Sequence, residues 1–206
     1  MSGRRKVGIM GGTFDPIHFV HLVLAENAYR AYDLDEVLIM PNSQPPHKQG
    51  RHITPGLDRL AMAQLAVKDV PYFRVSDMEI RRKGLSYTAR TLYELRQQHP
   101  DTDYYFIMGA DSVFQIETWH EPARILDSCI VLAAVRDHKR VSQLQEQIDY
   151  LHRKYGSDIR ILPIPELELS SSQIRCRRRE GLSVRFMLPD SVLEYMNSHH
   201  LYERES

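Results

Sequence analysis

Short apolar runs alternate with longer segments of helical periodicity along most of this 206-residue chain. The runs that predict strands are residues 7–10, 37–40, 73–75, 104–108, 130–135 and 159–162. Helices are expected at about 22–28, 57–67, 86–95, 141–154, 171–179 and 189–198, with Pro55 in the first turn of the second. Continuous apolar strands separated by helices are typical of a parallel sheet covered on both faces. The pattern therefore predicts a doubly wound α/β fold.

The length of the chain suits one compact domain. We expect residues 1–206 to form a single domain of the Rossmann-like class, with a C-terminal helical portion, about 170–206, packed on it. Ligands of such sheets bind beyond the carboxyl ends of the strands, near the point where the strand order reverses. The residues that directly follow each strand are therefore the candidates for function.

Composition excludes several classes of protein. The 27 basic residues equal the 27 acidic residues, which argues against a general nucleic-acid binder. Cys129 and Cys176 have no paired spacing, so neither a disulfide framework nor a zinc site is indicated. The sequence contains no apolar run of membrane-spanning length and no signal-peptide pattern, so we expect a cytoplasmic protein. A homodimer is one of the oligomeric states that the sequence leaves open.

The segment G-G-T-F-D-P-I-H-F-V-H, residues 11–21, follows the first strand and opens the first helix. Paired glycines let backbone N–H groups approach a phosphate, and the helix N-terminus favours negative charge. The segment is not G-x-G-x-x-G and lacks the lysine of a P-loop. His18 and His21 share a helix face, where two donors could hold phosphate oxygens and stabilise developing charge. Packing or surface histidines and a metal-ligating pair are the alternatives.

A second polar segment, L-S-S-S-Q-I-R, residues 169–175, follows the last strand. Serines at a helix start bind anions, and Arg175 one turn further on offers donors to phosphate. A plain N-cap is the alternative. The surrounding basic run, Arg175 and Arg177–Arg179, also fits a solvated helix face.

Together these two segments resemble the signatures of the nucleotidylyltransferase superfamily, H-x-G-H and [I/L]-S-S-[S/T]-x-I-R. The longer form G-G-T-F-D-P resembles specifically the bacterial nicotinate mononucleotide adenylyltransferases, and the resemblance extends over nearly the whole chain. It implies that His18, His21 and Arg175 contact ATP phosphates and act by positioning and charge stabilisation, with Mg²⁺ entering on ATP. It further implies these ATP-binding residues: Gly11, Gly12, Thr13, Phe14, Val20, Ser171 and Ser172.

One residue departs from the first signature. Val20 stands where the superfamily has the glycine of H-x-G-H, which lets adenine and ribose lie against the helix. A β-branched side chain would crowd them, so we expect a weakened but productive ATP site. The alternative is a nucleotide-binding protein without catalysis.

The middle of the chain resembles the acceptor side of the same family in P-P-H-K (45–48), S-Y-T (86–88), G-A-D (109–111) and W-H (119–120). The resemblance implies these acceptor-binding residues: Lys48, Thr88, Gly109, Asp111, Trp119 and Arg136. A flat indole suits a flat pyridine ring. Arg136 is followed by Asp137-His138 in place of the family's Pro-Gly. A core tryptophan, a helix cap at Thr88, a turn cap at Asp111 and a solvated Lys48 are the alternatives.

The implied reaction joins the AMP part of ATP to nicotinate mononucleotide, gives nicotinate adenine dinucleotide and releases pyrophosphate. A sister transferase acting on nicotinamide mononucleotide is the competing enzyme. The sequence shows no all-protein metal cage, which suits Mg²⁺ carried in on ATP.

Overall fold

A computed structural model describes residues 3–44, 53–82, 84–135 and 141–204. Its strands are β1 (Arg5–Gly12), β2 (Glu36–Pro41), β3 (Phe73–Val75), β4 (Thr102–Gly109), β5 (Ile130–Val135) and β6 (Ile159–Pro163). They form one sheet in the order β3-β2-β1-β4-β5-β6, with every neighbouring pair parallel. The doubly wound Rossmann-like fold is confirmed.

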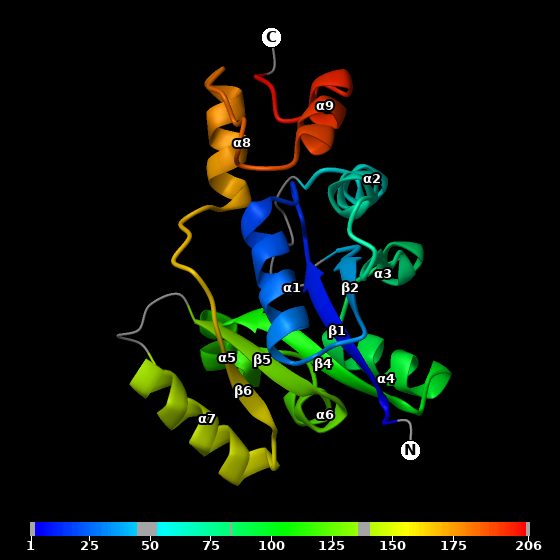
Figure 1. Cartoon of the computed structure of the whole chain (residues 1–206), viewed down its shortest axis with the longest axis vertical. Helices are drawn as coiled ribbons and strands as arrows, with labels where there is room; N and C mark the ends of the chain where they lie inside the picture. The colour runs from blue at the N-terminus through cyan, green and yellow to red at the C-terminus, as the bar shows by residue number, and fades with distance from the viewer. Residues whose placement is uncertain (1–2, 45–52, 83, 136–140, 205–206) are drawn as a thin grey trace.

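Helices connect and cover these strands (Figure 1). Their bounds are α1 (Phe19–Ala31), α2 (Gly56–Val67), α3 (Met78–Arg81), α4 (Thr88–Gln98), α5 (Ala110–Gln115), α6 (Pro122–Ser128), α7 (Val141–Tyr155), α8 (Ser171–Arg179) and α9 (Asp190–Ser198). A 3-10 turn, Ile116–Thr118, follows α5. None of the helices in the described ranges is both long enough and apolar enough to cross a membrane.

The chain reverses its direction of travel across the sheet between β1 and β4. From β1 it proceeds outward to β2 and β3, and it then returns to β4 on the other side of β1. The β1–β4 pairing sets Ile9 beside Phe106, so both strands end at the same edge of the sheet. Crevices at such a reversal are where α/β folds bind ligands. The glycine segment after β1 therefore lies where a ligand is expected.

Two apolar clusters lie on opposite faces of the sheet, because successive strand residues point to opposite sides. Met10 and Ile107 belong to the cluster that includes residues of α1, α2 and α9. Ile9 and Phe106 belong to the cluster that includes residues of α4, α6 and α7. The first cluster also contains Ile174 of α8, so the C-terminal helices bury apolar side chains against the α1 side of the sheet.

Three local expectations were wrong. Pro55 is the N-cap of α2 and does not lie within its first turn. The helix expected from Ser86 begins at Thr88, because the Ser86 hydroxyl accepts the backbone N–H of Ser43 at 3.0 Å and keeps this segment extended. The short helices α3, α5 and α6 were not expected, since segments of four to seven residues contain too few turns to show a helical period.

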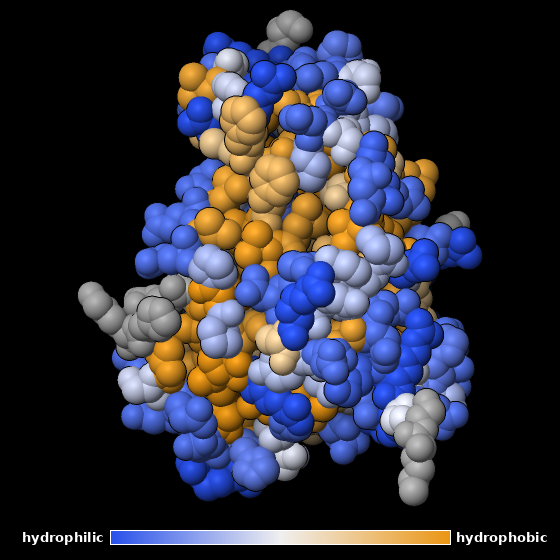
Figure 2. Space-filling model, in the orientation of Figure 1, coloured by the Kyte–Doolittle hydropathy of each residue, from blue (hydrophilic) through white to orange (hydrophobic). Residues whose placement is uncertain are grey.

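In the orientation of Figure 1, α8 and α9 stand at the end of the molecule toward which β1 points, while α7 lies at the opposite end. Figure 2 shows apolar surface over the middle of this face, below the C-terminal helices. Two exposed apolar side chains are Phe19, the first residue of α1, and Phe186, in the segment that precedes α9. Phe19 N–H donates to the carbonyl of Met187 at 3.2 Å, so this segment is attached to the first turn of α1.

Candidate active site

The segment between β1 and α1 folds back on itself. Phe14 has a left-handed backbone conformation, with φ of 49°, and only 2% of its surface is exposed. A Cβ atom at Gly12 would lie 2.8 Å from the Phe14 ring, which is closer than atoms can pack. Glycine is therefore required at position 12 so that the Phe14 ring can lie against the backbone. Gly11 and Thr13 border the same turn.

The two histidines of the first motif lie against each other. His18 is the N-cap of α1 and is buried, whereas His21 is in the first turn and partly exposed. Their rings stack with centroids 3.8 Å apart, so the two imidazoles lie side by side although His18 itself precedes the helix. His21 Nδ1 accepts the backbone N–H of His18 at 3.2 Å. In the neutral ring this acceptor role places the hydrogen on Nε2, so Nε2 is the donor of the ring.

The second motif contacts the segment in front of His18. Arg175 Nη1 donates to the carbonyl of Asp15 at 2.7 Å, and Ser171 Oγ donates to the carbonyl of Pro16 at 2.9 Å. Arg175 Nη2 also donates to Ser172 Oγ at 3.3 Å. Residues about 160 positions apart in the sequence thus meet within two to three residues of the histidine pair. The first and second motifs, which the resemblance assigns to the same ligand, therefore lie side by side.

The N-cap of α8 is Ser170, one residue before the serines assigned to ATP. Its hydroxyl accepts the backbone N–H of Gln173, and the Gln173 side chain accepts the N–H of Ser170 at 2.8 Å. This capping box satisfies the helix end without Ser171 or Ser172. The N-cap expected as the alternative for this segment is therefore present at Ser170, while Ser171 and Ser172 make other contacts.

The basic run after the second motif divides by role. Arg175 alone reaches the first motif, while Arg178 pairs with Glu203 at 2.8 Å. Arg177 Nε donates to the carbonyl of Ser183 at 3.0 Å. A uniformly solvated helix face is thus wrong for this segment.

Asp15 of the first motif is buried and is contacted from the C-terminus. Its carboxylate accepts the Tyr202 hydroxyl at 2.6 Å and lies 3.9 Å from Arg175 Nη1. Only 5% of the Asp15 surface is exposed. Burial, followed by the neighbouring Asp15 charge, raises the pKa of Tyr202, so the phenol stays protonated and donates. Neither residue was assigned a role from the sequence.

A cavity of about 710 Å³ adjoins the glycine turn on the other side. Gly11, Gly12 and Thr13, which the sequence predicts to bind ATP, line it together with Thr88 and Trp119, which the sequence predicts to bind the acceptor. Residues of both predicted groups therefore face one space.

Trp119 is half-buried and forms a T-shaped pair with Phe106, with ring centroids 6.4 Å apart and an interplanar angle of 87°. Because Trp119 keeps surface in the cavity, its reading as a purely core residue is wrong. Thr88 is the first residue of α4, and the N-cap is Tyr87. Thr88 is therefore not the cap of its helix.

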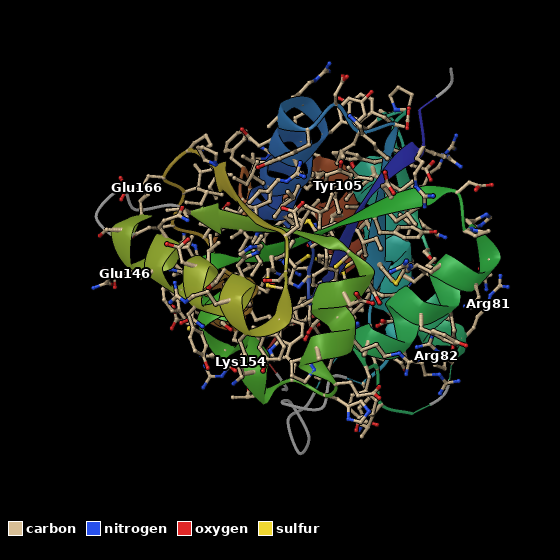
Figure 3. The ribbon with its side chains drawn as sticks, turned by 90° about the horizontal axis from the view of Figure 1, so that it is seen from below. Arg81, Arg82, Tyr105, Glu146, Lys154 and Glu166 are labelled. Carbon is tan, nitrogen blue, oxygen red and sulfur yellow. The ribbon has the colours of Figure 1, made fainter. Side chains whose placement is uncertain are left out.

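Glu79 is a buried carboxyl in the same cavity that sequence reasoning missed. Its carboxylate accepts the Thr91 hydroxyl, and Thr91 Oγ1 also accepts Arg82 Nη1 at 3.0 Å. Figure 3 shows Arg82 near α4, on the side of the molecule away from Lys154 of α7. Burial raises the pKa of Glu79, while hydrogen bonds from Thr91 and Ser86 oppose the shift.

The remaining assigned residues are placed differently. Gly109 and Asp111 stand at the start of α5, and both are exposed outside the set that lines the cavity. Val20 is 2% exposed and belongs to the apolar cluster on the α1 side of the sheet. Lys48 and Arg136 lie outside the described residues. Within the described ranges, no group of three His, Cys, Asp or Glu side chains could hold a metal ion.

Comparison with known proteins places this arrangement in a class. A family model described as cytidylyltransferase-like matches residues 9–177, from within β1 to within α8. The matched segment contains both motifs and all the residues that line the cavity. Since it spans well over half of the 206 residues, the chain belongs to the cytidylyltransferase-like family.

Curated relatives narrow the family further. A protein of Lachnoclostridium phytofermentans named probable nicotinate-nucleotide adenylyltransferase is 46% identical over 198 residues, covering 96% of this chain and 99% of the relative. A Dehalococcoides mccartyi protein with the same name is 40% identical over 204 residues, an alignment that covers 97% of this chain and 98% of the relative. These matches group the chain with the nicotinate-nucleotide adenylyltransferases.

Solved structures share the fold. The nicotinic acid mononucleotide adenylyltransferase of Plasmodium falciparum, complexed with NaAD, superposes with a TM-score of 0.78 over 96% of this chain and 97% of its own. The same enzyme complexed with APC gives a TM-score of 0.77. At 18% identity these likenesses support the architecture alone.

Proposed function

We propose that this chain transfers the adenylyl group of ATP to the phosphate of nicotinate mononucleotide, giving nicotinate adenine dinucleotide and pyrophosphate in NAD biosynthesis. The observation that carries the proposal is the contact of Arg175 and Ser171 with the segment in front of His18. This contact brings the Arg175 guanidinium close to the His18–His21 pair, and the glycine turn that precedes the pair borders the cavity lined by Trp119. The names of the curated relatives support the same reaction.

In the proposed reaction an oxygen of the acceptor phosphate attacks the α-phosphorus of ATP. A new phosphorus–oxygen bond forms while the bond from the α-phosphorus to the oxygen shared with the β-phosphorus breaks. Pyrophosphate leaves with that electron pair. The attacking phosphate is already anionic, so the reaction needs no general base, and catalysis consists of orientation and charge stabilisation.

Three side chains supply donors for this step. His21 Nε2–H and the His18 ring would stabilise charge on the phosphate at which substitution occurs. Arg175, held by Asp15 and Ser172, would bind the phosphates that leave. Gly11, Gly12, Thr13 and Phe14 shape the turn that receives the triphosphate, and Ser171 and Ser172 complete it.

ATP is proposed to enter with a divalent cation, Mg²⁺. No described cluster of side chains could hold a metal alone, and Asp15 is engaged by Tyr202. The phosphate oxygens of ATP would therefore be its main ligands, which suits a cation that keeps few protein ligands. When bound, it neutralises negative charge on the leaving phosphates.

On the acceptor side, Trp119 and Thr88 are proposed to bind the pyridine ring, since both line the cavity. Lys48 and Arg136 remain proposed contacts to the acceptor from the resemblance alone. Gly109 and Asp111 remain proposed as neighbours of the acceptor, where a Cβ atom at Gly109 would meet no other atom within 4 Å.

The test is pyrophosphate release from ATP and Mg²⁺, with nicotinate mononucleotide and nicotinamide mononucleotide as parallel acceptors. We expect faster turnover with the acid. We also expect His18→Ala to lower turnover by about 10²–10³-fold, the usual effect of removing one transition-state donor, with a much smaller loss of thermal stability. Arg74→Lys, on the exposed side of β3, is the control and should keep full turnover. Near-wild-type turnover of His18→Ala would refute the assignment.

A further inference from the structure

Arg59 occupies a position where a charged residue is unusual. It lies on the buried face of α2 with Met62, Ala63 and Val67, and only 1% of its surface is exposed. A guanidinium removed from water is unfavourable unless its N–H groups are hydrogen-bonded. Burial lowers the pKa of Arg59, and the nearby charge of Asp15 opposes that shift.

Three nitrogens of the Arg59 guanidinium donate to backbone carbonyls in three segments. Nη1 donates to Thr13 at 2.7 Å, Nη2 to Ser43 at 3.0 Å, and Nε to Thr54 at 2.9 Å. Thr13 follows β1, Ser43 follows β2, and Thr54 precedes α2. The planar guanidinium therefore fixes the spacing between the two segments that follow β1 and β2.

These two segments belong to different halves of the site. Thr13 lies in the glycine turn assigned to ATP. Ser43 N–H donates to Ser86 Oγ at 3.0 Å, and Ser86 N–H donates to the carbonyl of Gln44 at 3.0 Å. Ser86 begins the S-Y-T segment whose Thr88 lines the acceptor cavity. A continuous set of hydrogen bonds thus runs from the ATP turn through Arg59 to the acceptor segment.

We propose that Arg59 is a positioning residue that couples the two substrate sites, so that binding of ATP favours binding of the acceptor. The proposal rests on the proposed function. Binding of one ligand would order the segment on its side, and the hydrogen bonds of Arg59 would pass that order to the other segment. The second ligand would then lose less conformational entropy on binding. The effect is reciprocal, because a coupling free energy belongs to the pair of sites.

Trp119 is the only tryptophan of the chain and lines the acceptor cavity, so its fluorescence reports acceptor binding. The experiment measures the Kd of nicotinate mononucleotide with and without α,β-methylene-ATP and Mg²⁺, an analogue that cannot release pyrophosphate. For the wild type we expect the analogue to lower the Kd by about fivefold or more, the lower end of typical coupling. In Arg59→Lys the ratio should fall to within about twofold of one, because an ammonium cannot reach three carbonyls in a fixed plane.

The matched control is Leu151→Ala, which removes a fully buried side chain of α7 from the other face of the sheet. It should lower the melting temperature yet keep the wild-type coupling, which separates a general loss of stability from the loss of Arg59. Absence of coupling in the wild type, or coupling retained in Arg59→Lys, overturns the proposal. Loss of coupling in Leu151→Ala at equal folded fraction overturns it as well.

Arg59→Lys could fail to fold, and Ser86→Ala then tests the same path. This change removes the acceptor of the Ser43 N–H and keeps the backbone bond from Ser86 to Gln44. Coupling should weaken, and wild-type coupling in a folded Ser86→Ala protein would contradict the proposal. Pyrophosphate release by the wild type is measured in parallel. Coupled binding without pyrophosphate release would refute the proposed function and leave the role of Arg59 intact.

Discussion

Tyr202 donates a hydrogen bond of 2.6 Å to the buried carboxylate of Asp15, and Tyr202→Phe removes that donor while keeping the aromatic ring. Asp15 is 5% exposed, so water cannot readily replace the phenol. Hydrogen bonds to charged groups contribute about 1.5–3 kcal/mol, and an unsatisfied buried carboxylate lies at the upper end. For a chain of this size 1 kcal/mol changes Tm by about 2–4 °C, so we expect Tm to fall by about 3–12 °C.

Tyr202→Phe should also lower the catalytic efficiency with ATP. Arg175 is held partly by Asp15, at 2.7 Å from its carbonyl and 3.9 Å from its carboxylate. Release of Asp15 shifts the segment that leads into His18, and small misplacements near reacting groups cost about 10–100-fold in rate. We expect kcat/KM for ATP to fall by about that factor, measured by pyrophosphate release with saturating acceptor.

Tyr195→Phe is the matched control. Tyr195 also donates to a carboxylate, Asp58 at 2.9 Å, but this bond joins α9 to α2 and its acceptor is partly exposed. We expect a loss of about 1 kcal/mol or less and unchanged kcat/KM. Equal effects of the two changes on kcat/KM, or no effect of Tyr202→Phe on either quantity, would refute the reasoning.

Three further changes test other parts of the site. Val20→Gly should lower the free energy of unfolding by about 2–4 kcal/mol, since it removes a buried side chain from a helix, and should leave ATP affinity unchanged in calorimetric titration, because that side chain packs in the apolar cluster; a gain in affinity would support the crowding expected from the sequence. Burial raises the pKa of Glu79, so the folded state binds more protons than the unfolded state above the ordinary glutamate range. The wild type should therefore lose stability relative to Glu79→Gln as pH rises through the folded pKa, and a parallel pH dependence of the two would contradict this. Desolvation raises the pKa of the Cys129 thiol to about 12, and the hydrogen bond to Glu180 raises the pKa of the exposed Cys176 thiol. Native protein at pH 8 should therefore react with a thiol reagent faster at Cys176 than at Cys129, and equal rates at the two thiols would be inconsistent.

Much of the architecture follows from local patterns. Strands such as β5 are uninterrupted apolar runs, and helices such as α7 have clear periodicity, so their bounds could be predicted closely. The joining of the two motifs could also be predicted, because each follows a parallel strand and the carboxyl ends of such strands share one edge. The cavity shared by Thr88 and Trp119 with the glycine turn follows from the same rule.

Other features depend on contacts that no local pattern encodes. Arg59 is needed because three carbonyls from separate segments converge on one buried point. One signal was present: position 59 falls on the apolar face of α2, where a charge requires an explanation. Tyr202 bonds to a residue 187 positions away, and nothing near it in the sequence indicates Asp15 as its partner. The side chain of Val20 enters the core for the same reason, since its neighbours come from distant segments.

The central claim is that the histidine pair and Arg175 bind one triphosphate together. A crystal structure of the protein with α,β-methylene-ATP and Mg²⁺ tests it most directly. We predict phosphate oxygens within about 3 Å of both His21 Nε2 and the Arg175 guanidinium. A triphosphate bound away from either group would contradict the account.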